Sequence, residues 1–125
     1  MKTKPTILIA DDSPVNRQIL AELLGEDGYD FLFAANGEEA LEQLQGRFDI
    51  DLLLLDIHMP RLDGFGVLEA MASYGWSETL PVIIISSEDD ASFIQRAYDL
   101  GATDYISRPF NLTVVQRRVR NTLSL

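Results

Sequence analysis

Three short, unbroken apolar runs, each followed at once by polar residues, constrain the fold of this chain most. The runs lie at 7–10 (ILIA), 52–55 (LLLL) and 82–85 (VIII), and the polar residues after them are Asp11, Asp12, Asp56 and Ser86. Apolar runs of this length are typical of strands buried on both faces, as in parallel sheets covered by helices. Ligand sites in such sheets lie beyond the carboxyl ends of the strands. If the three strands are neighbours, we expect three carboxylates and a hydroxyl to meet in one site.

Length and composition limit the class of protein. With 125 residues, 46% of them hydrophobic, the chain fits a single folded domain over 1–125. It has no cysteine, which excludes disulfides and thiolate metal sites and favours a reducing compartment, so we expect a cytoplasmic protein. His58 is the only histidine, which excludes a multi-histidine metal site.

Charge and hydropathy limit the partners. A net charge of −10 argues against nucleic-acid binding by the domain as a whole. We expect neither a signal peptide nor a membrane span, because the apolar run before Asp11 is too short for either. The one basic cluster is Arg117, Arg118 and Arg120, which we interpret as the solvated face of a terminal helix, with partner docking as the alternative.

Capping and stop signals divide the chain into alternating elements. N-cap signals stand at Ser13-Pro14, at Asn36 with Glu39, and at Asn111, and stop signals stand at Gly28, Gly75 and Gly101. Acidic residues at 88–90 predict the first turn of another helix. Residues 29–34 suit an edge strand, and Tyr105-Ile106 a short one. Five strands alternating with five helices predict an α/β domain with a parallel sheet and right-handed crossovers.

The three aspartates at the strand ends predict a metal site. Asp11, Asp12 and Asp56 would repel one another unless a counter-charge lies between them. Carboxylate oxygens select the hard cations Mg²⁺, Mn²⁺ or Ca²⁺ over zinc. A Mg²⁺ site, in which Mn²⁺ could substitute, would leave room for phosphate oxygens. The alternative is that Asp11 and Asp12 only begin the turn before a helix.

Ser86 and Arg108 add a hydroxyl and a cation that could cradle a phosphoryl group facing the metal. Each residue also has a plainer interpretation. Ser86 could end its strand or cap the next helix, and Arg108 could be a surface charge beside a turn.

Four segments resemble the receiver domain of bacterial response regulators over the full length of the chain. They are ILIADD at 7–12, LLLLDIHMPRLDGF at 52–65, PVIIISS at 81–87 and GATDYISRPF at 101–110. The resemblance implies a doubly wound, flavodoxin-like (βα)5 fold with strand order 2-1-3-4-5. It also implies phosphoryl transfer from a phosphohistidine to one aspartate.

Matching motif to motif, Asp56 resembles the phosphoacceptor of the family. Asp12 resembles the direct Mg²⁺ ligand, and Asp11 the acid that acts more through water. The backbone carbonyl of His58 resembles the third protein ligand. His58 and Glu88 also match the two positions that tune the rate of dephosphorylation in the family.

The switch residues match the family with one departure. Ser86 resembles the hydroxyl that grips the phosphoryl group, and Tyr105 the aromatic that then swings inward. Arg108 stands where the family nearly always has lysine, and Arg108-Pro109 matches a dipeptide that is usually cis. Because arginine is a bulkier planar fork, we hypothesise that phosphate is coupled less well to the switch.

The resemblance implies partners as well. The phosphoryl donor would be a sensor histidine kinase or a phosphotransfer protein, and the switch would act on an output domain or protein. Residues 114–125 (VVQRRVRNTLSL) resemble the lead-in to cyclic-dinucleotide output domains, so the chain would be the receiver of a longer regulator or act alone. A phosphorylation-dependent homodimer is a further expectation.

Three other functions are weighed against the switch. A Mg²⁺-dependent phosphatase would want a second aspartate two residues after Asp56, where His58 stands. A flavin-binding protein would want a hydroxyl- and glycine-rich loop where Asp11 and Asp12 lie. A docking module that no longer uses phosphate is favoured only by Arg108.

As a switch, the chain would catalyse only its own aspartyl phosphorylation and dephosphorylation.

Overall fold

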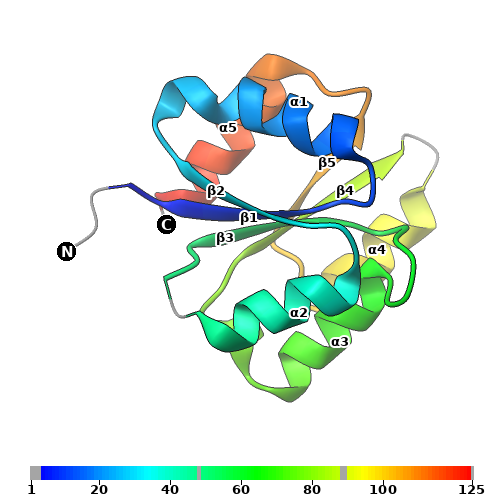
Figure 1. The fold of residues 1–125 in the computed structure, drawn as a ribbon. Helices are drawn as coiled ribbons and strands as arrows, with labels where there is room; N and C mark the ends of the chain where they lie inside the picture. Colours follow the sequence, from blue (N-terminus) through cyan, green and yellow to red (C-terminus); the bar gives the residue numbers. More distant parts are fainter. Residues whose placement is uncertain (1–3, 48, 88–89, 125) are drawn as a thin grey trace.

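The computed structural model describes residues 4–47, 49–87 and 90–124. Within these ranges five strands alternate with five α-helices (Figure 1). The strands are β1 (Thr6–Ala10), β2 (Asp30–Ala34), β3 (Leu52–Asp56), β4 (Val82–Ser87) and β5 (Asp104–Arg108). The helices are α1 (Pro14–Leu24), α2 (Gly37–Gly46), α3 (Gly64–Ser73), α4 (Ala91–Asp99) and α5 (Leu112–Leu123). Short 3-10 turns follow α1 at Gly25–Asp27 and α3 at Trp76–Glu78.

All five strands are parallel, in the order β2-β1-β3-β4-β5. The predicted α/β class and the strand order are therefore confirmed, and β2 is an edge strand as expected. The register pairs Ala10 with Leu55, and Asp56 with Ile85. Because the strands run in the same direction, their carboxyl ends meet at one edge of the sheet.

The sheet is covered on both faces, which explains the unbroken apolar runs. In Figure 1, α1 and α5 lie on one face, and α2, α3 and α4 lie on the other. Alternate strand residues belong to two cores: Ile7 and Leu54 pack with residues of α1 and α5, and Leu8 and Leu53 pack with residues of α2 and α3. Burying each such side chain contributes roughly 1.5–3 kcal/mol, so a polar residue inside these strands would be costly.

The predicted helix caps are confirmed. The side chain of Ser13 accepts a hydrogen bond from the Asn16 amide, and that of Asn111 accepts one from the Val114 amide. Asn36 Oδ1 accepts one from the Glu39 amide at 2.9 Å, and the Glu39 carboxylate accepts one from the Ala35 amide at 3.1 Å. Each cap pairs a backbone donor that the first turn leaves free.

One boundary differs from its prediction. Helix α4 begins at Ala91, so Asp90 precedes the first turn and makes no side-chain capping bond. The Asp90 carboxylate instead accepts a hydrogen bond from the Ser87 hydroxyl at 2.7 Å. Glu88 and Asp89 lie outside the described residues. In the described ranges, every helix is too short or too polar to cross a bilayer.

Candidate functional site

The polar ends of the central strands converge, as the sequence predicts. Asp11 and Asp12 follow β1, and Asp56 ends β3. Each of the three offers a carboxylate oxygen within 4.8 Å of the others. Such a cluster of hard oxygen donors suits a divalent cation with oxygen ligands. The alternative, in which Asp11 and Asp12 only begin a turn, does not account for this convergence.

Asp11 is completely buried. Its Oδ1 accepts a hydrogen bond from the Ser13 amide at 2.9 Å, and its backbone carbonyl accepts one from Arg17 Nη1 at 2.6 Å. Its Oδ2 has no hydrogen-bond partner among the described residues. Burial raises the pKa of Asp11 above its usual value, and the Asp12 charge adds to the rise. A buried carboxylate oxygen without a donor fits a metal ligand.

Asp56 is 2% exposed, at the centre of the site. Its Oδ1 accepts hydrogen bonds from the His58 amide at 3.3 Å and from Arg108 Nη2 at 3.4 Å. Burial, followed by the charge of Asp11, raises the pKa of Asp56 from 3.8 to about 6, although Arg108 opposes the rise. The carboxylate is therefore mostly ionised at neutral pH and protonated in mild acid.

Arg108 belongs to the site and is not a surface charge beside a turn. Its Nη1 lies 3.7 Å from Asp11 Oδ2, and its Nη2 lies 3.4 Å from Asp56 Oδ1. Its side chain is 27% exposed. The peptide bond to Pro109 is cis, as the resemblance implies.

Ser86 supplies a buried hydroxyl at the same edge of the sheet. The residue is completely buried in β4, and its Oγ has no hydrogen-bond partner among the described residues. Burying an unpaired hydroxyl costs about 1–3 kcal/mol, so a ligand that offers an acceptor would relieve this cost. Ser86 does not cap the following helix, whose N-cap position is Asp90.

His58 places its imidazole at the rim of the site. The side chain is 58% exposed, and Nε2 lies 3.6 Å from Asp90 Oδ2. The ring also meets Phe93 edge-on, with 5.4 Å between centroids. These contacts connect the loop after β3 with the start of α4, and sequence reasoning missed them. Glu88, the other expected tuning residue, lies outside the described residues.

Tyr105 is half-buried on the edge strand β5. The Arg118 guanidinium lies over its ring, 4.6 Å from the centroid, and Nη1 donates a hydrogen bond to the Tyr105 carbonyl. The basic cluster is therefore not uniformly solvated. Arg117 is exposed, whereas Arg118 is half-buried and Arg120 pairs with Asp27 at 2.8 Å. No local pattern signals these contacts.

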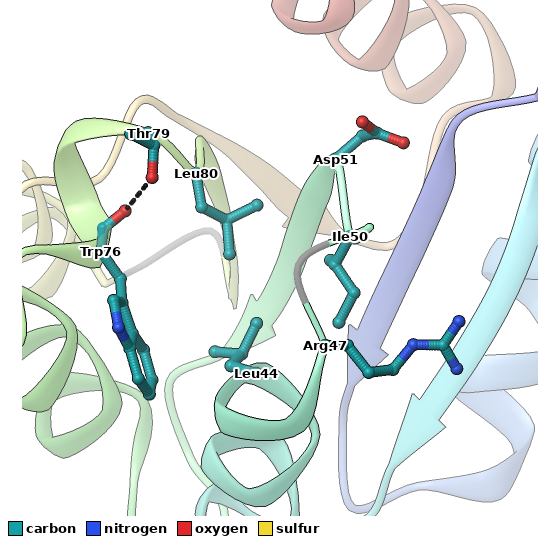
Figure 2. Close-up of a pocket in the computed structure, with 7 residues that line it drawn as sticks. All are labelled: Leu44, Arg47, Ile50, Asp51, Trp76, Thr79 and Leu80. Atoms are coloured by element: carbon teal, nitrogen blue, oxygen red, sulfur yellow. Dashed lines mark hydrogen bonds between the residues drawn. The ribbon is translucent and has the colours of Figure 1, made fainter. Parts of the chain in front are cut away.

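A pocket of about 280 Å³ lies elsewhere, before the amino ends of β3 and β4 (Figure 2). Its lining residues are Leu44, Arg47, Ile50, Asp51, Trp76, Thr79 and Leu80. The Arg47 guanidinium is held by two hydrogen bonds to Asp49. None of the residues expected to act at the site lines this pocket, which lies at the opposite end of the strands from Asp56.

Comparisons with known proteins agree with this geometry. A family model described as the response regulator receiver domain matches residues 7–120. Response regulator RR06 of Streptococcus pneumoniae is 36% identical over 114 residues, which are 91% of this chain and 51% of that protein. A probable cyclic di-GMP phosphodiesterase of Vibrio cholerae is 36% identical over 118 residues, which are 94% of this chain and 26% of that protein.

A crystal structure of a putative response regulator from Chloroflexus aurantiacus superposes with a TM-score of 0.92 and 31% identity. That comparison covers 98% of this chain and all of the other. By contrast, this chain spans only about half the length of RR06. The match to the family model over most of the chain, together with these relatives, shows that the chain belongs to the family of response regulator receiver domains of two-component systems.

Proposed function

We propose that this receiver is a phosphorylation-dependent signalling switch in which Asp56 accepts a phosphoryl group from a phosphohistidine. The convergence of Asp56 with two further carboxylates and a guanidinium is the observation that carries the proposal. An oxygen of the ionised Asp56 carboxylate attacks phosphorus. The bond from phosphorus to the donor imidazole breaks, and its electron pair returns to the imidazole nitrogen.

Asp11, Asp12 and Asp56 would hold Mg²⁺ or Mn²⁺, with the backbone carbonyl of His58 as a further ligand. Their oxygen donors fit such a cation, in particular Asp11 Oδ2, which accepts no hydrogen bond from the described residues. When bound, the cation would neutralise charge on the carboxylates and on the phosphoryl oxygens.

Ser86 and Arg108 would bind the phosphoryl group. The Ser86 hydroxyl has no hydrogen-bond partner in the part of the chain that the structure describes, so a phosphoryl oxygen would give it an acceptor. The Arg108 guanidinium already lies beside Asp56 and would donate to the same group. Tyr105 would then change its packing and alter the surface formed by β5 and its neighbours.

The test is incubation with Mg²⁺ and acetyl phosphate, followed by intact-mass analysis. Wild type is expected to gain the mass of one phosphoryl group, and Asp56→Asn is expected to gain none. Asp99→Asn is the matched control, since it makes the same change at an exposed residue that ends α4, and it should label like wild type. A full adduct on Asp56→Asn, or none on wild type, would contradict the proposal.

The partners follow from the same proposal. A sensor histidine kinase or phosphotransfer protein would donate the phosphoryl group in the cytoplasm, and an output domain or protein would respond. Similarity to a probable cyclic di-GMP phosphodiesterase supports a cyclic-dinucleotide enzyme domain as one such output. Phosphorylation-dependent dimerisation would appear as a change in sedimentation after treatment with acetyl phosphate.

A docking module with weakened phosphate coupling is the second candidate, and Arg108 is the observation that favours it. A guanidinium that already contacts two carboxylates has less freedom to follow a phosphoryl group. Comparing wild type with Arg108→Lys by NMR, with and without beryllofluoride, tests this candidate. Equal chemical-shift changes at Ser86 and Tyr105 in both proteins would contradict it.

A further inference from the structure

One guanidinium contacts both buried carboxylates of the site through different nitrogens. Arg108 Nη1 lies 3.7 Å from Asp11 Oδ2, and Nη2 lies 3.4 Å from Asp56 Oδ1. These two contacts require the planar guanidinium of arginine, which presents two nitrogens in different directions. A lysine ammonium is a single compact charge, so it could not offer separate nitrogens to the two acids.

The Arg108 guanidinium lies beside carboxylate oxygens of Asp11 and Asp56, which are candidate ligands of the divalent cation. Asp11 Oδ1 accepts a hydrogen bond from the Ser13 amide, whereas Oδ2 accepts none from the residues that the structure describes. Asp11 is 0% and Asp56 2% exposed, so solvent screens little of their charge. The guanidinium carries a delocalised positive charge, so a cationic group of the protein itself lies beside both acids.

We infer that Arg108 is an internal counter-cation that competes with the divalent cation for Asp11 and Asp56 and so sets the metal affinity of the receiver. This inference rests on the proposed function and adds a residue that opposes metal binding. Two positive charges cannot both approach the same oxygens closely without repelling each other. The Arg108 side chain is 27% exposed, so part of it already lies at the protein surface.

The competition is reciprocal. If the guanidinium lowers the affinity for the cation by a given factor, the cation weakens the contacts of the guanidinium with the carboxylates by the same factor. The free receiver would therefore keep its acids neutralised by Arg108, and the metal-loaded receiver would release Arg108 for another anion. A phosphoryl group on Asp56 is such an anion.

The experiment is calorimetric titration of Mg²⁺, repeated with Mn²⁺, into wild type, Arg108→Gln and Arg108→Lys. Arg108→Gln is expected to bind either cation at least about 5-fold more tightly, and Arg108→Lys to fall between the two. Arg47→Gln is the matched control. It makes the same change in net charge at the opposite end of the strands and should shift the affinity less than about 2-fold, because salt screens distant charges.

Thermal unfolding gives an independent measurement. In EDTA, Arg108→Gln is expected to melt below wild type, because its two buried acids lack their counter-charge. Added Mg²⁺ should raise its melting temperature more than that of wild type. Circular dichroism identifies folded variants, and Arg108→Lys keeps the comparison usable if the glutamine variant does not fold.

Equal affinities in wild type and Arg108→Gln, or an equal shift in Arg47→Gln, would overturn the inference. In that outcome phosphorylation of Asp56 would be unaffected, so the proposed function would stand. Absence of metal binding in every variant would overturn the inference and also the metal requirement of the proposed function. Loss of the Asp56 adduct from wild type would instead remove the proposed function, whatever the titrations show.

Discussion

The imidazole of His58 lies 3.6 Å from the carboxylate of Asp90, so the loop after β3 contacts the segment before α4. The same carboxylate accepts a hydrogen bond from the Ser87 hydroxyl, which lowers the pKa of Asp90 and keeps it ionised. Since Ser87 follows Ser86, and His58 lies two residues after Asp56, this contact joins the expected phosphorylation site to the expected switch.

His58→Ala should loosen the start of α4 without abolishing phosphorylation. The substitution removes the contacts with Asp90 and Phe93 but keeps the backbone carbonyl and amide beside Asp56. We expect faster amide hydrogen exchange over 90–94 and retention of the acetyl phosphate adduct. Glu69→Ala is the control, because its ion pair with Arg96 of α4 is exposed and contributes little. Unchanged exchange in His58→Ala, or loss of its adduct, would contradict this prediction.

Metal-free wild type should lose stability as the pH rises through about 6. Because burial raises the pKa of Asp56 from its ordinary value of 3.8 to about 6 in the folded protein, the folded protein binds the proton more tightly than the unfolded chain. The stabilisation is complete below pH 3.8 and is lost as the pH rises through about 6. At about 1.4 kcal/mol per pKa unit, the loss is on the order of 3 kcal/mol.

Urea unfolding in EDTA at about pH 3.5 and about pH 7.5 measures this effect, because these two values lie below and above the interval between 3.8 and about 6. Asp56→Asn cannot ionise at this position, so its free energy of unfolding should exceed that of wild type at the higher pH. The two proteins should be closer at the lower pH. If the free energies of unfolding of wild type and Asp56→Asn changed with pH in parallel, the raised pKa of Asp56 would not be the cause of the pH dependence.

Gly64→Ala should destabilise the fold through the backbone of the site. A Cβ added at Gly64 would lie 2.5 Å from the Asp56 carbonyl oxygen, which belongs to a buried strand and cannot move aside easily. We expect a loss of at least about 2 kcal/mol in the free energy of unfolding. Gly46→Ala is the matched control, since a Cβ there meets nothing within 4 Å in helix α2 and should be neutral or stabilising. Similar effects of both substitutions would contradict the close approach at Gly64.

Arg118→Gln should free the Tyr105 ring and lower stability by about 1–2 kcal/mol. The guanidinium stacks over that ring and donates to the Tyr105 carbonyl. Arg117→Gln is a control with the same charge change at an exposed neighbour, and it should change stability by less than about 0.5 kcal/mol. Urea unfolding measures the stability, and NMR coupling constants of Tyr105 report rotamer freedom. If the two variants were indistinguishable, Arg118 would not restrain the ring.

The helix starts could be predicted because each cap lies within one short segment. Ser13, Asn36 and Asn111 each accept a hydrogen bond from an amide three residues later. The beginning of α4 was predicted wrongly, because Asp90 binds the Ser87 hydroxyl and does not act as an acidic residue of the first turn. The local sequence pattern does not show which of two available partners a side chain such as that of Asp90 will bind.

The partners of Arg108, His58 and Tyr105 could not be predicted in the same way. Arg108 meets Asp56 across 52 positions of sequence, and Arg118 reaches Tyr105 from a different element. Contacts between residues so far apart in the sequence depend on the direction and length of side chains that start from different elements of the fold. The family resemblance assigned expected roles to these positions, but it did not predict that one guanidinium would contact two acids.

The strand order that makes the three polar strand ends neighbours came from the family resemblance. The alternation of apolar runs and polar ends by itself predicted a parallel sheet whose strands end in polar residues. The reason is that a strand covered on both faces tolerates polar residues only where it leaves the core. Only the tertiary structure decided three properties of the site. They are the raised pKa of Asp56, the Ser86 hydroxyl without a hydrogen-bond partner among the described residues, and the contact of the Arg108 guanidinium with two acids. These properties depend on burial and on charges brought within a few ångströms of one another, and distance along the sequence does not encode them.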